Sequence, residues 1–220
     1  MIFRSSKKKY LVFDLDNTLI VRDQAMIDCI ENIFKKKLSN SQKVVIKKQD
    51  EEGHSDRIVF CQWLKVFLKI QINKNEIWDL IKNNIGFFVS LNDGARPMLQ
   101  DLHGKYELVL LTNGGKENQQ RKIDHTGLKE FFPEERIFIS GQIGYSKPNP
   151  RIFQLVENKF GKNNHYCMIG NHFEKDIIGA KEIGWQAIYL SQEKKYSSIE
   201  NVICISSLSK MNKALYELKY

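Results

Sequence analysis

The sequence YLVFDLDNTL at residues 10–19 decides the fold. Its first four residues are apolar, which predicts a short strand that is buried on both faces. The strand ends at Asp14, and a second carboxylate follows at Asp16. Two carboxylates this close repel each other unless a cation or a shared proton relieves them. The pair therefore suits a Mg2+ site, or a nucleophile beside a general acid and base, and the alternative is an ordinary turn.

Five further apolar runs predict the remaining strands, at residues 107–111, 136–140, 166–169, 186–190 and 202–205. Helical patterns precede or separate them, at residues 94–103, 116–125, 150–160 and 173–183. Strands that alternate with helices need crossover connections, and these connections place helices on both faces of a parallel sheet. The expected fold class is therefore α/β, with a doubly wound, Rossmann-like parallel sheet.

Residues 21–90 interrupt this alternation. They carry no convincing strand but several helical patterns, at residues 25–38, 56–70 and 75–84. We expect residues 21–90 to form a small α-helical cap domain, and residues 1–20 and 91–220 to form the core. The cap should cover the carboxyl ends of the strands, where ligands bind in open α/β sheets. Its candidates for contact with a substrate are Arg22, His54, Arg57 and Trp63.

Three later strand ends also carry polar groups. Thr112, Asn113 and Gly114 follow the second strand, and their hydroxyl, amide and backbone N–H groups can cradle an anion. Lys147 stands beside two prolines that restrict its backbone, and a fixed ammonium group can neutralise phosphate charge. Residues 170–176 open a helix after the fourth strand, and their oxygen atoms can complete a Mg2+ shell.

The four strand ends together resemble the four motifs of the haloacid dehalogenase superfamily, in order and in spacing. The matching segments are FDLDNTL at residues 13–19, TNG at 112–114, SKPNPRIF at 146–153 and the glycine-led segment 170–176. The chain resembles the phosphatase branch, in which a helical cap follows the first motif. The resemblance extends over nearly the whole chain.

This resemblance implies a Mg2+-dependent phosphomonoester hydrolase that acts on a small phosphorylated metabolite, of the nucleotide or sugar phosphate type. Asp14 would form an aspartyl-phosphate, and Asp16 would act as general acid and then as general base. Lys147 would be the catalytic cation. The residues that would bind the phosphate or the rest of the substrate are Thr18, Thr112, Asn113, Gly114, His54 and Arg57. The residues that would hold Mg2+ are Asp14, Asp16, Asn171 and Asp176.

Asn171 departs from the family pattern, because an aspartate usually follows the glycine of the fourth motif. An amide oxygen can bind Mg2+, but it lacks the charge of a carboxylate. We therefore expect weaker Mg2+ binding than in typical members, unless Asp176 compensates. A degenerate member that binds a phosphorylated ligand or a protein, with impaired catalysis, would also account for Asn171.

Two further activities use the same motifs. A sugar-phosphate mutase fits the pattern, and only the cap would distinguish it. Hydrolytic dehalogenases of the superfamily also use an aspartate nucleophile, but they lack the second aspartate of the first motif. Asp16 therefore counts against dehalogenation.

The composition narrows the class of protein but does not name the substrate. The 220 residues, 42% of them hydrophobic and 27% charged, are typical of one globular unit with an insert, and no stretch is apolar enough for a membrane span. The net charge of +8 comes from dispersed lysines, which favours a solvated surface over a nucleic-acid site. Four widely spaced cysteines favour reduced thiols. We expect a cytoplasmic monomer or homodimer with no nucleic-acid or membrane partner.

Overall fold

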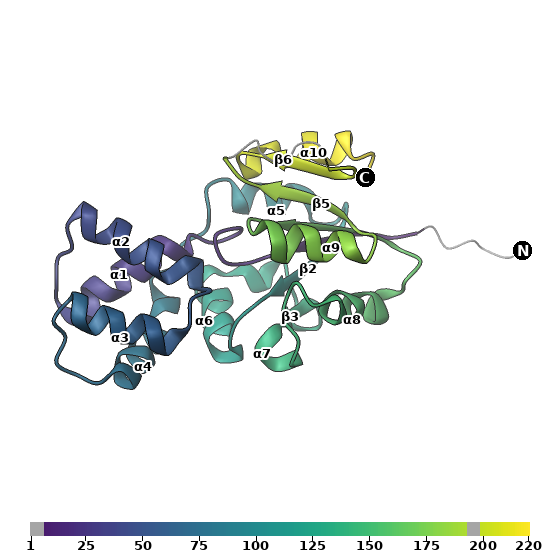
Figure 1. The fold of residues 1–220 in the computed structure, drawn as a ribbon. Coiled ribbons are helices and arrows are strands. Elements are labelled where there is room, and N and C mark those ends of the chain that lie inside the picture. The colour runs from purple at the N-terminus through teal and green to yellow at the C-terminus, as the bar shows by residue number, and fades with distance from the viewer. Residues whose placement is uncertain (1–6, 193–198) are drawn as a thin grey trace, which may run out of the picture.

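A computed structural model describes residues 7–192 and 199–220, so residues 1–6 and 193–198 of the predicted core lie outside the described residues. Its centre is a six-stranded parallel sheet with the strand order β3-β2-β1-β4-β5-β6 (Figure 1). The strands are β1 (Lys9–Phe13), β2 (Glu107–Thr112), β3 (Ile137–Ile139), β4 (His165–Gly170), β5 (Gln186–Leu190) and β6 (Val202–Ile205). Each predicted strand is present, and the doubly wound α/β fold is confirmed.

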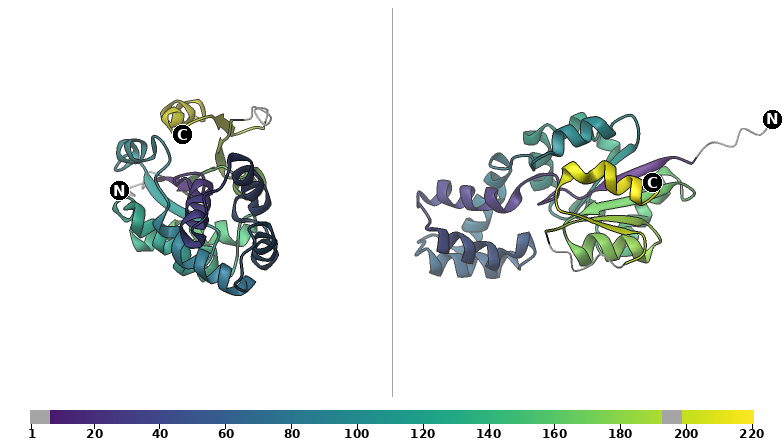
Figure 2. Two further views of the ribbon diagram at one scale, coloured as in Figure 1. Left: turned by 90° about the vertical axis from the view of Figure 1, so that its left-hand side faces the viewer. Right: turned by 90° about the horizontal axis from the view of Figure 1, so that it is seen from above.

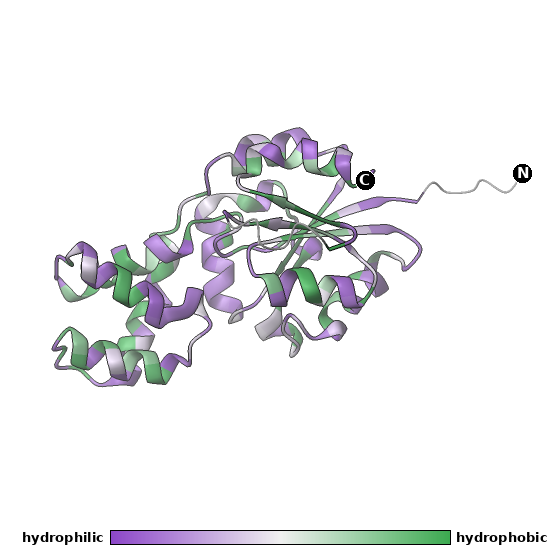
Figure 3. Ribbon diagram, turned by 45° about the horizontal axis from the view of Figure 1, so that its top comes forward, coloured by the Kyte–Doolittle hydropathy of each residue, from purple (hydrophilic) through white to green (hydrophobic). Residues whose placement is uncertain are grey.

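Strand β1 lies inside the sheet because its residues are apolar on both faces. Leu11 and Phe13 point into one apolar cluster, whereas Tyr10 and Val12 point into another. The helices over the first cluster are α5 (Ala95–Leu102), α6 (Lys116–Thr126) and α10 (Met211–Glu217). The helices over the second are α8 (Pro150–Phe160) and α9 (Gly179–Glu182). Figure 3 shows the result, a hydrophobic sheet between helices with polar outer faces.

The strand order also creates the place for a site. The chain runs from β1 outward to β2 and β3, and then returns to build β4, β5 and β6 on the other side of β1. Crossovers in opposite directions turn to opposite faces of the sheet, which leaves a crevice beyond the carboxyl end of β1. Asp14 is the first residue past this end, and its backbone N–H donates to the carbonyl oxygen of Ile169 on β4 at 2.9 Å.

The segment between β1 and α5 forms a helical lobe at one end of the molecule (Figure 1 and the right-hand view of Figure 2). Its helices are α1 (Arg22–Phe34), α2 (Asn40–Asp50), α3 (Arg57–Phe67) and α4 (Lys74–Asn84). Helix α2 was not predicted, because Ile46 is its one buried apolar residue and gives no periodic pattern. A capping box between Ser39 and Gln42 starts it instead.

Two segments of the chain connect the helical lobe to the sheet, and they run antiparallel and hydrogen-bond to each other. The N–H of Val21 donates to the carbonyl oxygen of Ser90 at 2.9 Å, and the N–H of Asn92 donates to that of Leu19 at 2.8 Å. The apolar cluster on this face of the sheet continues into the lobe without a break. The division into a core domain and a cap domain stays a prediction.

Two smaller features agree with the sequence. All four cysteines have free thiols, and three of them are buried: Cys29, Cys61 and Cys167. Among the described residues, no helix combines the length and the apolar character that crossing a bilayer would require.

A buried ionic triad ties three helices of the lobe together. Asp50, at the end of α2, is 1% exposed. Its carboxylate accepts hydrogen bonds from the guanidinium group of Arg22 on α1 and, at 2.7 Å, from Arg57 on α3. Burial alone would raise the pKa of Asp50, but the two guanidinium groups lower it below its usual range. Removing this carboxylate would therefore leave the buried cation of Arg22 and the half-buried cation of Arg57 without it.

We expect Asp50→Ala to lower the free energy of unfolding by about 3–5 kcal/mol, because both arginines lose a desolvated partner. The matched control is Asp79→Ala, which removes an exposed ion pair with Lys82 on α4. The control should lower the free energy of unfolding by less than about 1 kcal/mol. Denaturant unfolding followed by circular dichroism measures both values, and equal losses would contradict a structural role for the triad.

Candidate active site

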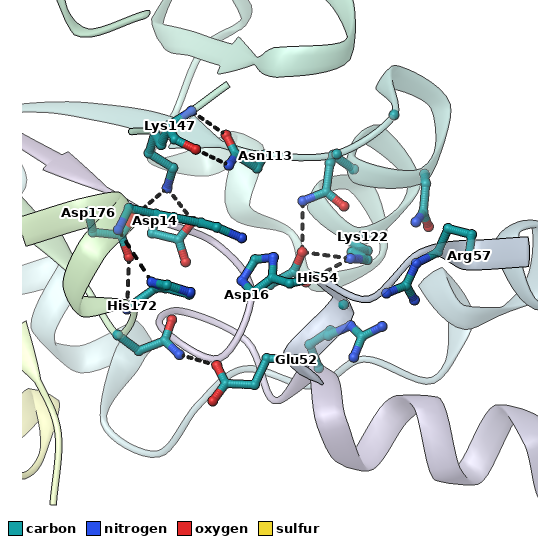
Figure 4. Close-up of a pocket in the computed structure, with 18 of the residues that line it drawn as sticks. Asp14, Asp16, Glu52, His54, Arg57, Asn113, Lys122, Lys147, His172 and Asp176 are labelled. Atoms are coloured by element: carbon teal, nitrogen blue, oxygen red, sulfur yellow. Dashed lines mark hydrogen bonds and ion pairs between the residues drawn. The ribbon is translucent and has the colours of Figure 1, made fainter. Parts of the chain in front are cut away.

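A pocket opens beyond the carboxyl ends of β1, β2 and β4, where the helical lobe meets the sheet (Figure 4). Most predicted site residues line it: Asp14, Asp16, His54, Arg57, Asn113, Gly114, Lys147, Asn171 and Asp176. Thr18 and Thr112 are fully buried beneath its wall. From the lobe, Trp78 lines the pocket, whereas Trp63 stacks on Phe67 with a ring separation of 4.7 Å.

Asp14 forms the floor of the pocket. One carboxylate oxygen accepts a hydrogen bond from Lys147 Nζ at 2.7 Å, and the other lies 3.1 Å from the hydroxyl of Thr18. The residue is 7% exposed. Burial raises the pKa of Asp14 to about 7, although the nearby ammonium of Lys147 pulls it down. The carboxylate is thus fixed in orientation, and its charge is costly until further positive charge arrives.

Lys147 bridges two buried carboxylates. Its Nζ lies 2.7 Å from Asp14 and 2.7 Å from Asp176. The side chain of Asn113 fixes the backbone of Lys147 from the neighbouring strand, because it accepts from the N–H of Lys147 and donates to its carbonyl oxygen, both at 2.9 Å. Asn113 therefore positions the lysine with its side chain. Its predicted contact with phosphate stays a prediction.

Asp176 reaches Lys147 because the end of β4 has no side chain in the way. A Cβ atom on Gly170 would lie 2.2 Å from Asp176 Oδ2. That oxygen accepts a hydrogen bond from the N–H of His172 at 3.0 Å, and His172 directly precedes the π-helical turn η5 (Phe173–Ile178) that carries Asp176. One oxygen of Asp176 is thus hydrogen-bonded to the backbone, and the other forms the ion pair with Lys147. This geometry favours support of Lys147 over direct contact with a metal.

Two residues of helix α6 hold Asp16. The sequence predicts this helix but does not indicate its contact with Asp16. Lys122 Nζ lies 2.7 and 2.8 Å from the two carboxylate oxygens, and Gln119 Nε2 lies 2.9 Å from one of them. Burial alone would raise the pKa of Asp16, but Lys122 and then Arg22 lower it. The sequence places Gln119 and Lys122 on one face of a predicted helix. It carries no signal that this face meets Asp16.

The polar groups after β2 were predicted to bind an anion, and in the structure two of them bind other protein groups. The hydroxyl of Thr112 accepts from Gln119 Nε2 at 2.7 Å, and the N–H of Gly114 donates to Ser140 Oγ at 2.9 Å. Both groups already have partners within the protein. Their predicted roles in phosphate binding stay predictions.

The lobe contributes four polar side chains to the pocket, and the first of them, Arg22, is bound to Asp50. The guanidinium group of Arg57 donates hydrogen bonds to Asp50 and to Ser55. The ring of His54 meets the ring of His172 edge to face, with centroids 4.8 Å apart. Glu52 accepts a hydrogen bond from the amide nitrogen of Asn171 at 2.7 Å. Glu52 was not a predicted site residue, and it gives the lobe a hydrogen bond to the fourth motif beside the ring contact of His54.

The oxygens around Thr18 suit a hard cation. The Thr18 hydroxyl lies 3.1 Å from Asp14 Oδ2 and 3.1 Å from Asn171 Oδ1, yet its single proton can serve one of them only. An oxygen-rich position of this kind fits Mg2+. Within residues 7–192 and 199–220, no three His, Cys, Asp or Glu side chains form a metal cluster. An ion here would therefore also need amide, carbonyl and water oxygens.

Comparison with known proteins gives a family and several relatives. The model of the haloacid dehalogenase-like hydrolases matches residues 8–184. A glyceraldehyde 3-phosphate phosphatase of Methanothermobacter thermautotrophicus is 37% identical over 97 residues, which cover 43% of this chain and 42% of that protein. The pyrimidine 5'-nucleotidase YjjG of Escherichia coli is 28% identical over 126 residues, covering 56% and 55%. The chain thus spans about half the length of these two relatives.

Two matches extend further. A glyceraldehyde 3-phosphate phosphatase of Pyrococcus furiosus is 27% identical over 201 residues, which cover 84% of this chain and 82% of that protein. The crystal structure of YfnB from Bacillus subtilis, bound to magnesium, superposes with a TM-score of 0.78 at 20% identity and covers 97% of this chain and 100% of that one. The second likeness shows that the fold is shared.

The shared ammonium of Lys147 yields a stability prediction. Lys147→Met leaves Asp14 and Asp176 buried side by side, so the free energy of unfolding should fall by about 3–5 kcal/mol near neutral pH. Burial already raises the pKa of Asp14, and without the ammonium it rises further above its unfolded value. A group with a raised folded-state pKa loses stability as the pH rises, so the deficit should be larger at about pH 8 than at about pH 5.

Urea unfolding of wild type and variant at both pH values measures this deficit. The control is Lys116→Met, at the exposed start of α6, which should change the free energy of unfolding by less than about 0.5 kcal/mol. A deficit in Lys147→Met that does not depend on pH would show that the two carboxylates do not share this cation.

Proposed function

The chain belongs to the haloacid dehalogenase-like hydrolases, and from this premise we propose that it is a Mg2+-dependent phosphatase that hydrolyses the phosphomonoester of a small metabolite. Relatives named as phosphatases of glyceraldehyde 3-phosphate and as a pyrimidine 5'-nucleotidase support a substrate of the sugar phosphate or nucleotide type. The observation that carries the proposal is the buried Asp14, held between Lys147 and Thr18 with Asp16 two residues away.

In the first step, an oxygen of Asp14 forms a bond to phosphorus while the bond from phosphorus to the leaving oxygen breaks. Asp16 gives that oxygen a proton. In the second step, Asp16 takes a proton from water, which attacks the same phosphorus and releases phosphate with Asp14 restored. Lys122 and Gln119 hold Asp16 at fixed distances, and the positive charge of Lys122 favours the ionised form that the second step requires.

Lys147 stabilises the negative charge that gathers on the phosphoryl oxygens, because its ammonium group already lies at the nucleophile. The proposed holders of Mg2+ are Asp14, Asn171 and the backbone carbonyl of Asp16. The ion would neutralise phosphate charge and lower the pKa of Asp14 toward its ordinary value. Asp176 would keep Lys147 in place from the opposite side. Location in the cytoplasm and the oligomeric state stay predictions.

We expect Asp14→Asn to remove essentially all hydrolysis of p-nitrophenyl phosphate, because an amide cannot attack phosphorus. Asp16→Asn should lower kcat by roughly 10² to 10⁴, the usual contribution of a general acid and base. Asp79→Asn, on the exposed face of α4, should retain the wild-type rate. A chelator should stop turnover, and added Mg2+ should restore it.

Steady-state kinetics with and without Mg2+ measure these effects, and a panel of phosphorylated metabolites then ranks the substrates. Full activity in Asp14→Asn would exclude an aspartyl-phosphate. Transfer of the phosphoryl group to another position of the sugar, without release of phosphate, would favour a mutase. Binding of phosphorylated ligands without turnover in the wild type would favour a degenerate member.

A further inference from the structure

Glu52 connects the helical lobe to two of the core loops that surround the nucleophile. It lies in the short turn η1 (Glu51–Gly53) between α2 and α3, and its side chain stands across the pocket from Lys147 (Figure 4). One carboxylate oxygen accepts from the amide nitrogen of Asn171 at 2.7 Å and lies 3.5 Å from that of Asn17. Asn171 follows β4, and Asn17 belongs to the loop after β1.

The turn that presents Glu52 has an unusual backbone. Glu51 and Glu52 have φ values of 50° and 55°, and Gly53 has 90°. Successive residues with side chains rarely adopt this left-handed region, and they stay there only where the surroundings hold them. Here a Cβ atom on Gly53 would lie 3.1 Å from the guanidinium carbon of Arg22, so the turn is pressed against the buried triad. The lobe thus holds the backbone of Glu52 in a fixed position.

Glu52 decides which way the amide of Asn171 points. An ionised carboxylate only accepts hydrogen bonds, so the amide nitrogen must face Glu52. The amide oxygen then faces Thr18, at 3.1 Å, on the side of Asp14. A flipped amide would turn N–H groups toward the position that fits Mg2+ and would repel a cation.

We propose that Glu52 is a positioning residue, which holds the amide oxygen of Asn171 toward the Mg2+ position and so couples binding of the ion to contact between the lobe and the core. This rests on the proposed function, since it assigns Mg2+ to that site. Coupling is reciprocal, so an ion that favours the oriented amide also favours the contact through Glu52. The lobe would therefore be drawn to the core when the site is loaded.

The proposal also gives a reason for the unusual asparagine. An aspartate at this position would place a second carboxylate 2.7 Å from that of Glu52, and like charges so close repel each other. An asparagine can instead donate to Glu52 and present an oxygen to the ion at the same time. Asn171 and Glu52 are thus complementary, one in the core and one in the lobe.

The dissociation constant of Mg2+ tests the proposal without any substrate. In calorimetric titrations, Glu52→Ala should weaken Mg2+ binding about three- to tenfold, the effect of losing one solvent-exposed hydrogen bond. Glu52→Gln keeps an acceptor oxygen and should fall between wild type and Glu52→Ala. Glu51→Ala is the matched control, because its position shares the left-handed backbone and the exposure but does not line the pocket, and it should bind as wild type.

Hydrogen exchange measures the reciprocal effect. Mg2+ should slow exchange of the backbone amides of residues 51–54 in wild type and in Glu51→Ala, but not in Glu52→Ala. Equal Mg2+ affinities for Glu52→Ala and Glu51→Ala would overturn the proposal, even if Asp14-dependent turnover establishes the phosphatase. Conversely, loss of Mg2+ affinity in Glu52→Ala would support the positioning role even if no phosphomonoester is hydrolysed.

Discussion

One buried ammonium group, shared between two carboxylates, sets the geometry on which the rest of the pocket depends. Lys147 lies 2.7 Å from Asp14 and from Asp176, and all three side chains are almost fully buried. Three separate strand ends supply them, so the ammonium faces both carboxylates only if β1, β4 and the loop after β3 keep their positions. Asn113 fixes the lysine backbone, and Gly170 leaves room for Asp176. Apolar clusters pack on both faces of the sheet and hold the strands in place. The charged side chains at the strand ends are therefore held in fixed positions.

Two aspartates two residues apart have opposite electrostatic settings. The pKa of Asp14 is raised by burial, although Lys147 opposes the change, whereas the pKa of Asp16 is lowered because Lys122 and Arg22 outweigh its burial. The lowered pKa of Asp16 favours the ionised form, which is the one that the proposed second step requires. The raised pKa of Asp14 opposes the ionised form that a nucleophile needs, so the proposed attack depends on further positive charge at the site. Here the difference comes from helix α6, which brings Lys122 and Gln119 to Asp16 and leaves Asp14 to the loop that carries Lys147.

The fold could be predicted because strands buried on both faces leave continuous apolar runs, and all six runs are strands. Helix α2 could not, since Ile46 alone among its apolar residues is buried. Helix α10 is a different case: its buried residues Met211, Ala214 and Leu215 have helical spacing that the sequence does show. The site residues after the strands could be predicted for the same topological reason, because parallel strands end at one edge. Gln119, Lys122 and Glu52 could not, since their roles depend on which helix face or turn meets a distant loop.

Asn171 shows why a single residue should be interpreted with its partner. From the sequence, an amide in place of a carboxylate means a loss of charge at a metal site. In the structure, the same amide donates to Glu52 of the lobe while its oxygen faces Thr18 and Asp14. A carboxylate accepts only, so it could fill one of these two roles and would oppose the other. Compared with an aspartate, Asn171 therefore brings no negative charge to the core, but it adds a hydrogen bond to Glu52 of the lobe. A negative charge still borders the pocket, because Glu52 of the lobe lines it next to Asn171.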